Sequence, residues 1–210
     1  FSRDSRLIAA SAANNSVKVW DVNSGRELQT LAGPQATISA AIGVYFIGFA
    51  SDNRLVTMSD SARVWDLNTG RELRTLELTG PEMSGFTGTD GGMAISGDGT
   101  QFVLLTDDSE PHARVIDLAS GREVRNVKLS DKRIENINFA FTADGRVLAA
   151  GLIDKRLKLW DLATKKEQEL GHVAKEYPPL KFSRDGRVLA LSEQYVVRLW
   201  DVASGRELTQ

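Results

Sequence analysis

The stretch Val17-Lys18-Val19-Trp20-Asp21 decides the fold, because close copies of it recur along the chain. The other copies are Arg63-Val64-Trp65-Asp66, Arg114-Val115-Ile116-Asp117, Leu157-Lys158-Leu159-Trp160-Asp161 and Val197-Arg198-Leu199-Trp200-Asp201. All the tryptophans of the chain occupy the same position in this pattern, which Ile116 fills in the third copy. A short run of aliphatic and β-branched residues with a constant ending predicts a β-strand within a repeated unit.

A turn-like element precedes each of these strands. Its copies are Phe1-Ser2-Arg3-Asp4-Ser5-Arg6, Phe49-Ala50-Ser51-Asp52-Asn53-Arg54, Ile95-Ser96-Gly97-Asp98-Gly99-Thr100, Phe141-Thr142-Ala143-Asp144-Gly145-Arg146 and Phe182-Ser183-Arg184-Asp185-Gly186-Arg187. Successive aspartates of this element lie 41 to 48 residues apart, close to the period of about 40 to 45 residues of four-stranded propeller blades. Since Asp-Gly, Asp-Ser and Asp-Asn pairs tolerate a positive φ angle, each copy predicts a tight turn between two strands.

A third element follows each strand. It reads Ser24-Gly25-Arg26-Glu27-Leu28, Thr69-Gly70-Arg71-Glu72-Leu73, Ser120-Gly121-Arg122-Glu123-Val124 and Ser204-Gly205-Arg206-Glu207-Leu208, with Thr164-Lys165-Lys166-Glu167 as a degenerate copy. Three ordered elements that recur in step resemble the WD-repeat family over essentially the whole chain. The Ser-Gly-Arg-Glu-Leu style is similar to the WD repeats of bacterial multidomain proteins.

The resemblance implies an all-β fold, a β-propeller built from four-stranded antiparallel blades. We assign five WD repeats to a single propeller region, with blades at approximately 1–31, 32–78, 79–129, 130–170 and 171–210. Because most rings of this family have about seven blades, these repeats predict a partial or open ring.

The tryptophan of each repeat is expected to fill the space between blades, while the next aspartate accepts hydrogen bonds from the following turn. The residues given this structural role are Trp20, Asp21, Trp65, Asp66, Asp117, Trp160, Asp161, Trp200 and Asp201. We expect Trp65 and Trp160 to be buried between blades. Trp20 and Trp200 belong to the end blades, so we expect them to be less covered.

The hydrogen-bond network that often stiffens WD repeats is eroded in this chain. Its Gly-His pair is matched by Gly171-His172 alone, and its aspartate before the tryptophan strand by Asp154 alone. The equivalents of Asp154 in the other repeats are Asn14, Ser59, Glu110 and Gln194. Rigidity must then come mainly from apolar packing, and we expect the third blade, which has Ile116 in place of tryptophan, to be the loosest.

Composition narrows the chemistry. The chain has no cysteine, which excludes disulfides and thiolate metal sites, and its net charge of −2 comes from interspersed charges. We therefore expect no nucleic-acid partner. No apolar run is long enough to span a bilayer, so no membrane association is expected either, and we place the protein in the cytoplasm. Because the chain begins with Phe1, we expect it to be a piece of something longer.

Two loops carry residues that chemistry could use. The stretch Asp107-Asp108-Ser109-Glu110-Pro111-His112 gathers carboxylates and a histidine, but its spacing matches no known metal loop, and we interpret it as a solvated connection. The glycine-rich stretch from Gly80 to Gly92 lacks the lysine and the following helix of a phosphate loop. We therefore expect no catalytic centre, no metal and no cofactor.

The predicted function is a non-catalytic scaffold that binds a protein or peptide. The connections that vary in length between repeats belong to the top face, and variable loops on a rigid frame are where recognition usually occurs. The candidate partner-binding residues are Phe86, Asp108, His112, Lys132, Arg133, His172, Tyr177 and Tyr195. The alternative is a regulatory or substrate-recruiting propeller of a larger enzyme, a caspase-like peptidase, kinase or ATPase, whose catalytic domain lies outside this chain. Further propeller blades or a second copy are the other expected partners.

Overall fold

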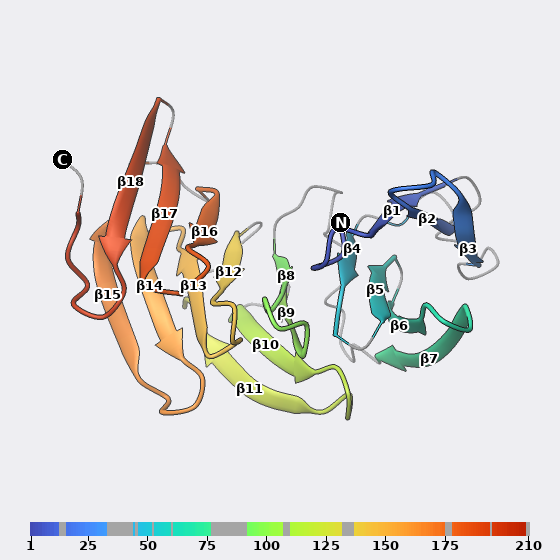
Figure 1. The fold of residues 1–210 in the computed structure, drawn as a ribbon. Coiled ribbons are helices and arrows are strands. Elements are labelled where there is room, and N and C mark those ends of the chain that lie inside the picture. Colours follow the sequence, from blue (N-terminus) through green and yellow to red (C-terminus); the bar gives the residue numbers. More distant parts are fainter. Residues whose placement is uncertain are drawn as a thin grey trace. The chain divides into compact units, whose positions relative to one another are not determined.

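The computed structural model describes residues 1–12, 16–32, 44, 46–51, 53–59, 61–76, 92–106, 110–131, 137–174, 178–193 and 195–208, and none of them is helical (Figure 1). Their strands form five antiparallel sheets of three or four strands, in which consecutive strands pair in sequence order. This arrangement confirms the predicted all-β fold of antiparallel propeller blades. The chain divides into two compact units, Phe1–Asp90 and Gly91–Gln210.

The first unit contains the first two blades. The strands of the first blade are β1 (Leu7–Ser11), β2 (Val17–Asp21) and β3 (Glu27–Leu31), and those of the second are β4 (Phe46–Phe49), β5 (Arg54–Met58), β6 (Ala62–Asp66) and β7 (Arg71–Leu76). Each repeated strand that ends in Trp-Asp is therefore the strand before the last one of its blade.

The second unit contains three blades. Their strands are β8 (Met93–Ile95), β9 (Gln101–Leu105), β10 (His112–Asp117) and β11 (Glu123–Lys128), then β12 (Phe139–Phe141), β13 (Val147–Gly151), β14 (Arg156–Asp161) and β15 (Glu167–His172), then β16 (Leu180–Phe182), β17 (Val188–Glu193) and β18 (Val196–Asp201). A single bridge between Trp200 and Glu207 continues the last sheet beyond β18.

The aspartate that ends each repeated strand organises the turn that follows. In the fifth blade, Oδ1 of Asp201 accepts hydrogen bonds from the backbone N–H of Ser204 at 2.7 Å and from its hydroxyl at 2.6 Å. Gly205 then adopts a φ of 70°, a left-handed conformation that glycine tolerates without strain. Lys165 takes the same conformation in the fourth blade, with a φ of 63°, so the degenerate repeat keeps the turn without its glycine.

Adjacent blades pack through two different faces. In the first unit, Val17, Val19 and Leu31 of the first blade form one buried cluster with Leu55, Trp65 and Leu67 of the second. In the second unit, Leu157, Leu159 and Leu170 of the fourth blade cluster in the same way with Leu189, Leu191 and Trp200 of the fifth. Because side chains alternate along a strand, each blade has an aliphatic face, which contains the Val17 and Val19 positions, and an opposite tryptophan face.

The tryptophan face is directed toward the preceding blade. Trp200 is therefore covered by the fourth blade and is only 1% exposed, whereas Trp20 of the first blade is partly exposed. Trp65 and Trp160 are buried, as expected. The expectation that Trp200 is less covered, as a residue of an end blade, is wrong, because its covering neighbour precedes it in the chain.

The last strand of three blades contains a β-bulge. The pairing of β2 with β3, β6 with β7 and β10 with β11 shifts by one residue just before the Trp20, Trp65 and Ile116 positions. The additional residue is Leu28, Leu73 or Val124, and each of them is exposed. The degenerate repeat lacks this residue, since Gln168 follows Glu167 directly, and its pairing shifts between Leu157 and Lys158 instead.

Candidate interaction site

The predicted partner-binding residues fall into two groups. His112, His172 and Tyr195 belong to the described residues, whereas Phe86, Asp108, Lys132, Arg133 and Tyr177 lie outside them. His112 begins β10, where its N–H donates to Oγ1 of Thr106 at 2.9 Å and its carbonyl accepts from the N–H of Thr106 at 2.9 Å. Its backbone therefore closes the connection between β9 and β10, and its side chain is partly buried.

His172 and Tyr195 lie near the connection between the fourth and fifth blades. The His172 carbonyl accepts a hydrogen bond from Nη1 of Arg198 at 3.0 Å, and the His172 residue is exposed. Tyr195, in the turn between β17 and β18, is 99% exposed. Among the described candidates, no two side chains share a hydrogen bond, so the structure does not bring His112, His172 and Tyr195 together in one site.

Arg198 is the centre of a charged cluster beside His172. Its guanidinium forms two bonds with Glu207, at 2.7 and 2.8 Å, contacts Glu193 at 3.3 Å and lies 4.7 Å from the centre of the Trp200 ring. Glu193 also accepts a hydrogen bond from the backbone N–H of Ala174. The hydrogen bonds with Glu207 raise the pKa of Arg198 and lower that of Glu207. The cluster therefore ties the segment after β15 to the fifth blade.

A groove of about 440 Å³ opens between the third and fourth blades. It is lined by Lys128, Leu129, Ser130, Asp131, Ile153, Asp154 and Arg156. These residues come from the end of β11 and the connection between β13 and β14, the two kinds of connection assigned to the top face. The groove is thus the described part of that face.

Ion pairs organise the charges of this top-face groove. Nζ of Lys128 lies 2.9 Å from Asp131 and 3.0 Å from Glu110, and these contacts raise the pKa of Lys128. The hydrogen bond from Lys128 in turn lowers the pKa of Asp131. Burial favours a higher pKa for Asp154, but the hydrogen bonds from Arg156, with Nη2 at 2.5 Å, hold it below its usual value. The carboxylates of the groove therefore stay charged at neutral pH.

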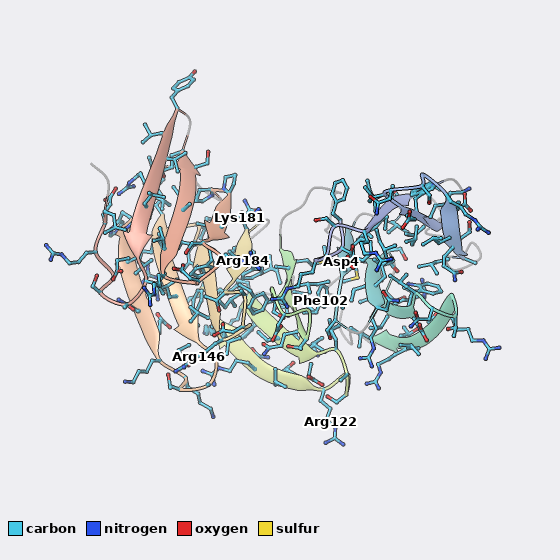
Figure 2. The ribbon with its side chains drawn as sticks, in the orientation of Figure 1. Asp4, Phe102, Arg122, Arg146, Lys181 and Arg184 are labelled. Carbon is cyan, nitrogen blue, oxygen red and sulfur yellow. The ribbon has the colours of Figure 1, made fainter. Side chains whose placement is uncertain are left out.

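A second groove of about 710 Å³ lies between the fourth and fifth blades, on the face of the constant turns. Its charged lining consists of Asp144, Arg146, Asp161, Arg184, Asp185, Arg187 and Asp201. Arg146 and Arg184, both labelled in Figure 2, come from the turn before β13 and the turn between β16 and β17. The sequence analysis did not predict this groove, although the arginine after each Asp-Gly turn was a signal for it.

One ion pair recurs in every blade and was also missed in the sequence. The basic residue two positions before each tryptophan, or before Ile116, pairs with the glutamate of the following turn, nine residues further along. The pairs are Lys18 with Glu27, Arg63 with Glu72, Arg114 with Glu123, Lys158 with Glu167 and Arg198 with Glu207. The constant spacing of nine residues could have revealed them.

Within the described ranges, no group of three or more histidine and carboxylate side chains is arranged to hold a metal ion. The same part of the chain contains no helix long and apolar enough to cross a membrane.

Comparisons with known proteins match the repeat pattern. The family model for the WD domain, G-beta repeat, matches residues 1–21 and 132–161. The chain is also similar to Pre-mRNA-processing factor 19 homolog 2 of Arabidopsis thaliana, with 32% identity over 88 residues. That match covers 41% of this chain and 17% of the plant protein, so the chain spans less than a fifth of the length of this relative.

Proposed function

This chain is a WD-repeat protein, and from that premise we propose that it is a non-catalytic scaffold whose top face binds a protein or peptide. Proteins of this family are generally not catalysts and typically mediate protein–protein interaction. The single observation that supports a top-face site in this chain is the groove between the third and fourth blades, because it lies between loops that vary from repeat to repeat.

The charges around the top-face groove favour a basic partner. Four carboxylates, those of Glu110, Asp131, Asp154 and Glu169, are joined there by ion pairs to two cations, Lys128 and Arg156. The excess charge is therefore negative. The side chain of Asp131 is 90% exposed, so one of these carboxylates is accessible to a partner. Complementary charge of this kind mainly sets the association rate and the choice of partner.

The walls of the groove are rigid enough for recognition. Leu129 is buried, and its N–H bonds to the carbonyl of Pro111, while the N–H of Leu152 bonds to the carbonyl of Arg156. The groove therefore rests on ordered backbone on both sides. We propose a peptide segment with a lysine or arginine as the partner chemistry, since such a side chain can pair with Asp131.

The test uses a partner captured by the chain from the source cell, identified and then purified. Asp131→Lys should lower the affinity for this partner at least about tenfold, because it reverses the charge of the groove at an exposed position. Arg122→Glu is the matched control: Figure 2 shows Arg122 projecting away from the turn between β10 and β11, and this turn belongs to the other face of the same blade. Equal losses for both variants would contradict the top-face site.

The candidates outside the described residues give a second test of the same face. Lys132→Glu combined with Tyr177→Ala should abolish binding of the purified partner. Arg26→Glu combined with Arg71→Glu, which changes two exposed side chains of the constant turns, should leave the affinity nearly unchanged. The reverse pattern, measured by titration calorimetry, would overturn the assignment of the binding face.

A further inference from the structure

The chain builds one kind of interface in each of its two units. In the first unit, the aliphatic face of the first blade is covered by Leu55 and Trp65 on the tryptophan face of the second. In the second unit, Leu157 and Leu159 on the aliphatic face of the fourth blade are covered by the tryptophan face of the fifth. The covered aliphatic side chains are at most 3% exposed. The two faces are therefore complementary surfaces that the repeat provides in every blade.

The fifth blade has an aliphatic face that no described residue covers. Val197 occupies the repeat position of Leu157, which is fully buried, yet Val197 is 58% exposed. Leu199 and its cross-strand neighbour Ala190 are partly exposed on the same face, as is Val188. We name these four residues, Val188, Ala190, Val197 and Leu199, the free aliphatic face. Its composition matches the corresponding positions of the fourth blade, Val147, Ala149, Leu157 and Leu159.

The first blade has the opposite surplus. Ile8 pairs with Trp20 across β1 and β2, as Leu55 pairs with Trp65 and Leu189 with Trp200. Leu55, Leu189, Trp65 and Trp200 are buried, whereas Ile8 and Trp20 are both partly exposed. We name Ile8, Ala10 and Trp20 the free tryptophan face. A partly exposed tryptophan beside an isoleucine is the type of surface that elsewhere in the chain is buried by an aliphatic face.

We propose that the chain of residues 1–210 associates head to tail, with the free tryptophan face of one copy packed on the free aliphatic face of a second copy. The occupant follows from the interfaces inside the chain, because each free face is one half of an interface that the same sequence pattern already forms. No charge repulsion opposes the contact at the tryptophan face, since Lys18 is neutralised by Glu27 at 2.6 Å. A contact between two different faces is heterologous, so the copies form a ring or an open-ended series.

Sedimentation velocity over a range of concentrations tests the association. The wild-type chain should shift to larger species as concentration rises. Val197→Glu, on the free aliphatic face, and Trp20→Ser, on the free tryptophan face, should each abolish the shift. A wild-type chain that stays monomeric at all concentrations would overturn the proposal, whether or not the variants fold.

Mixing the two variants distinguishes a head-to-tail contact from a symmetric one. The Val197→Glu chain keeps an intact tryptophan face and the Trp20→Ser chain keeps an intact aliphatic face, so an equimolar mixture should form a 1:1 heterodimer and nothing larger. In a symmetric contact, one of the two variants would still form a homodimer alone, and that result would overturn the proposed geometry.

A matched control separates this contact from general hydrophobic association. Leu73→Glu changes an apolar side chain that is 51% exposed, close to the exposure of Val197, but lies on the bulge of β7. Its sedimentation should be that of the wild type. If Leu73→Glu dissociates the oligomer as completely as Val197→Glu does, the free aliphatic face is not the contact surface. Far-UV circular dichroism of each variant confirms that the strands are retained.

Discussion

Trp65 and Trp200 stabilise their blades in two ways. Each side chain fills space against the preceding blade, within a cluster of buried aliphatic residues. The indole N–H of Trp65 also donates to Oγ1 of Thr57 at 2.8 Å, and that of Trp160 donates to Glu167 at 3.1 Å. Burial of these rings therefore leaves no polar atom of Trp65 or Trp160 without a partner, which avoids the cost of an unpaired donor.

The direction of the tryptophan faces predicts unequal effects of truncation. Trp200→Ala and Trp160→Ala should each lower the free energy of unfolding by about 3 to 5 kcal/mol, because each leaves a cavity between blades. Trp20→Ala should cost less than about 2 kcal/mol, because its ring is partly exposed and leaves a smaller cavity. Urea unfolding followed by circular dichroism, at concentrations low enough to keep the chain monomeric, measures the three values. Equal losses for Trp20 and Trp200 would contradict the assigned direction.

The turn aspartates predict a loss of stability in acid. Hydrogen bonds from Ser204 hold the pKa of Asp201 below 3.8, and those from Ser24 do the same for Asp21. Because the unfolded chain then binds protons more readily than the folded one, this stabilisation is complete above about pH 5 and disappears as pH falls through the lowered pKa values. The double variant Asp21→Asn, Asp201→Asn should melt at a lower temperature than the wild type at pH 6. A difference that stays constant down to pH 3, rather than vanishing, would refute this cause.

Single residues show where sequence reasoning succeeded and where it failed. The burial of Trp65 and Trp160 follows from the repeat, because any blade with neighbours must cover its largest apolar side chain. The burial of Trp200 does not follow, because a sequence pattern states that a ring is covered but not which neighbour covers it. The top-face groove was only partly anticipated: the d–a and b–c connections were expected to form it, but Asp131 and Arg156 were not singled out.

The last strand of a blade is shaped by one residue that the repeat adds or omits. Leu28, Leu73 and Val124 create bulges in β3, β7 and β11, while the fourth blade omits the residue and still forms β15. A bulge bends an edge strand and disrupts its ladder, which hinders pairing with the edge of another sheet. The exposed aliphatic side chain at each bulge is therefore compatible with a soluble blade edge.

Deletion of a bulge residue should be tolerated. Removing Leu73 gives the second blade the same spacing as the fourth, so the chain should still fold, with a loss of less than about 2 kcal/mol. Removing Val56 from the middle of β5, whose pairing with β4 and β6 is regular, should unfold the blade, because a one-residue slip turns every following side chain to the opposite face. Thermal melts of both variants provide the comparison. A Leu73 deletion as damaging as the Val56 deletion would contradict the role given to the bulge.

Strands and turns were the most predictable elements. Alternating aliphatic runs and Asp-Gly turns gave the hairpins, because local chemistry determines both. The bulges were not predicted, since the extra leucine is visible only when the degenerate copy at Glu167-Gln168 is compared with the others. The ion pairs were missed for a related reason: Arg114 and Glu123 belong to different repeated motifs, and only the pairing of β10 with β11 brings them to 2.7 Å.

Stability in this chain is a sum of contacts between neighbouring blades. The cluster of the first unit draws its side chains from the first and second blades, and the cluster of the second unit draws its own from the fourth and fifth. In such repeat proteins, each unit mainly stabilises the units beside it. Damage in one cluster should therefore remain local.

Hydrogen exchange tests this locality. Leu191→Ala, which removes a buried side chain from the cluster of the fourth and fifth blades, should accelerate amide exchange in β14, β17 and β18. Exchange in β2, β5 and β6 should stay at the wild-type rate under native conditions. Val19→Ala is the reciprocal variant, with the affected strands exchanged. Acceleration in both clusters after either substitution would show that the chain opens as one cooperative body.

The direction of the tryptophan faces also gives the chain an order of assembly on the ribosome. Translation releases the amino-terminal blades first, and each later blade emerges with its indole ring directed toward a blade that has already been synthesised. A nascent tryptophan, and the N–H that it must pair, therefore finds its binding surface ready. The surface left waiting for the next blade is always aliphatic and has no side-chain donor to satisfy, so a pause in synthesis exposes the less demanding half of the interface.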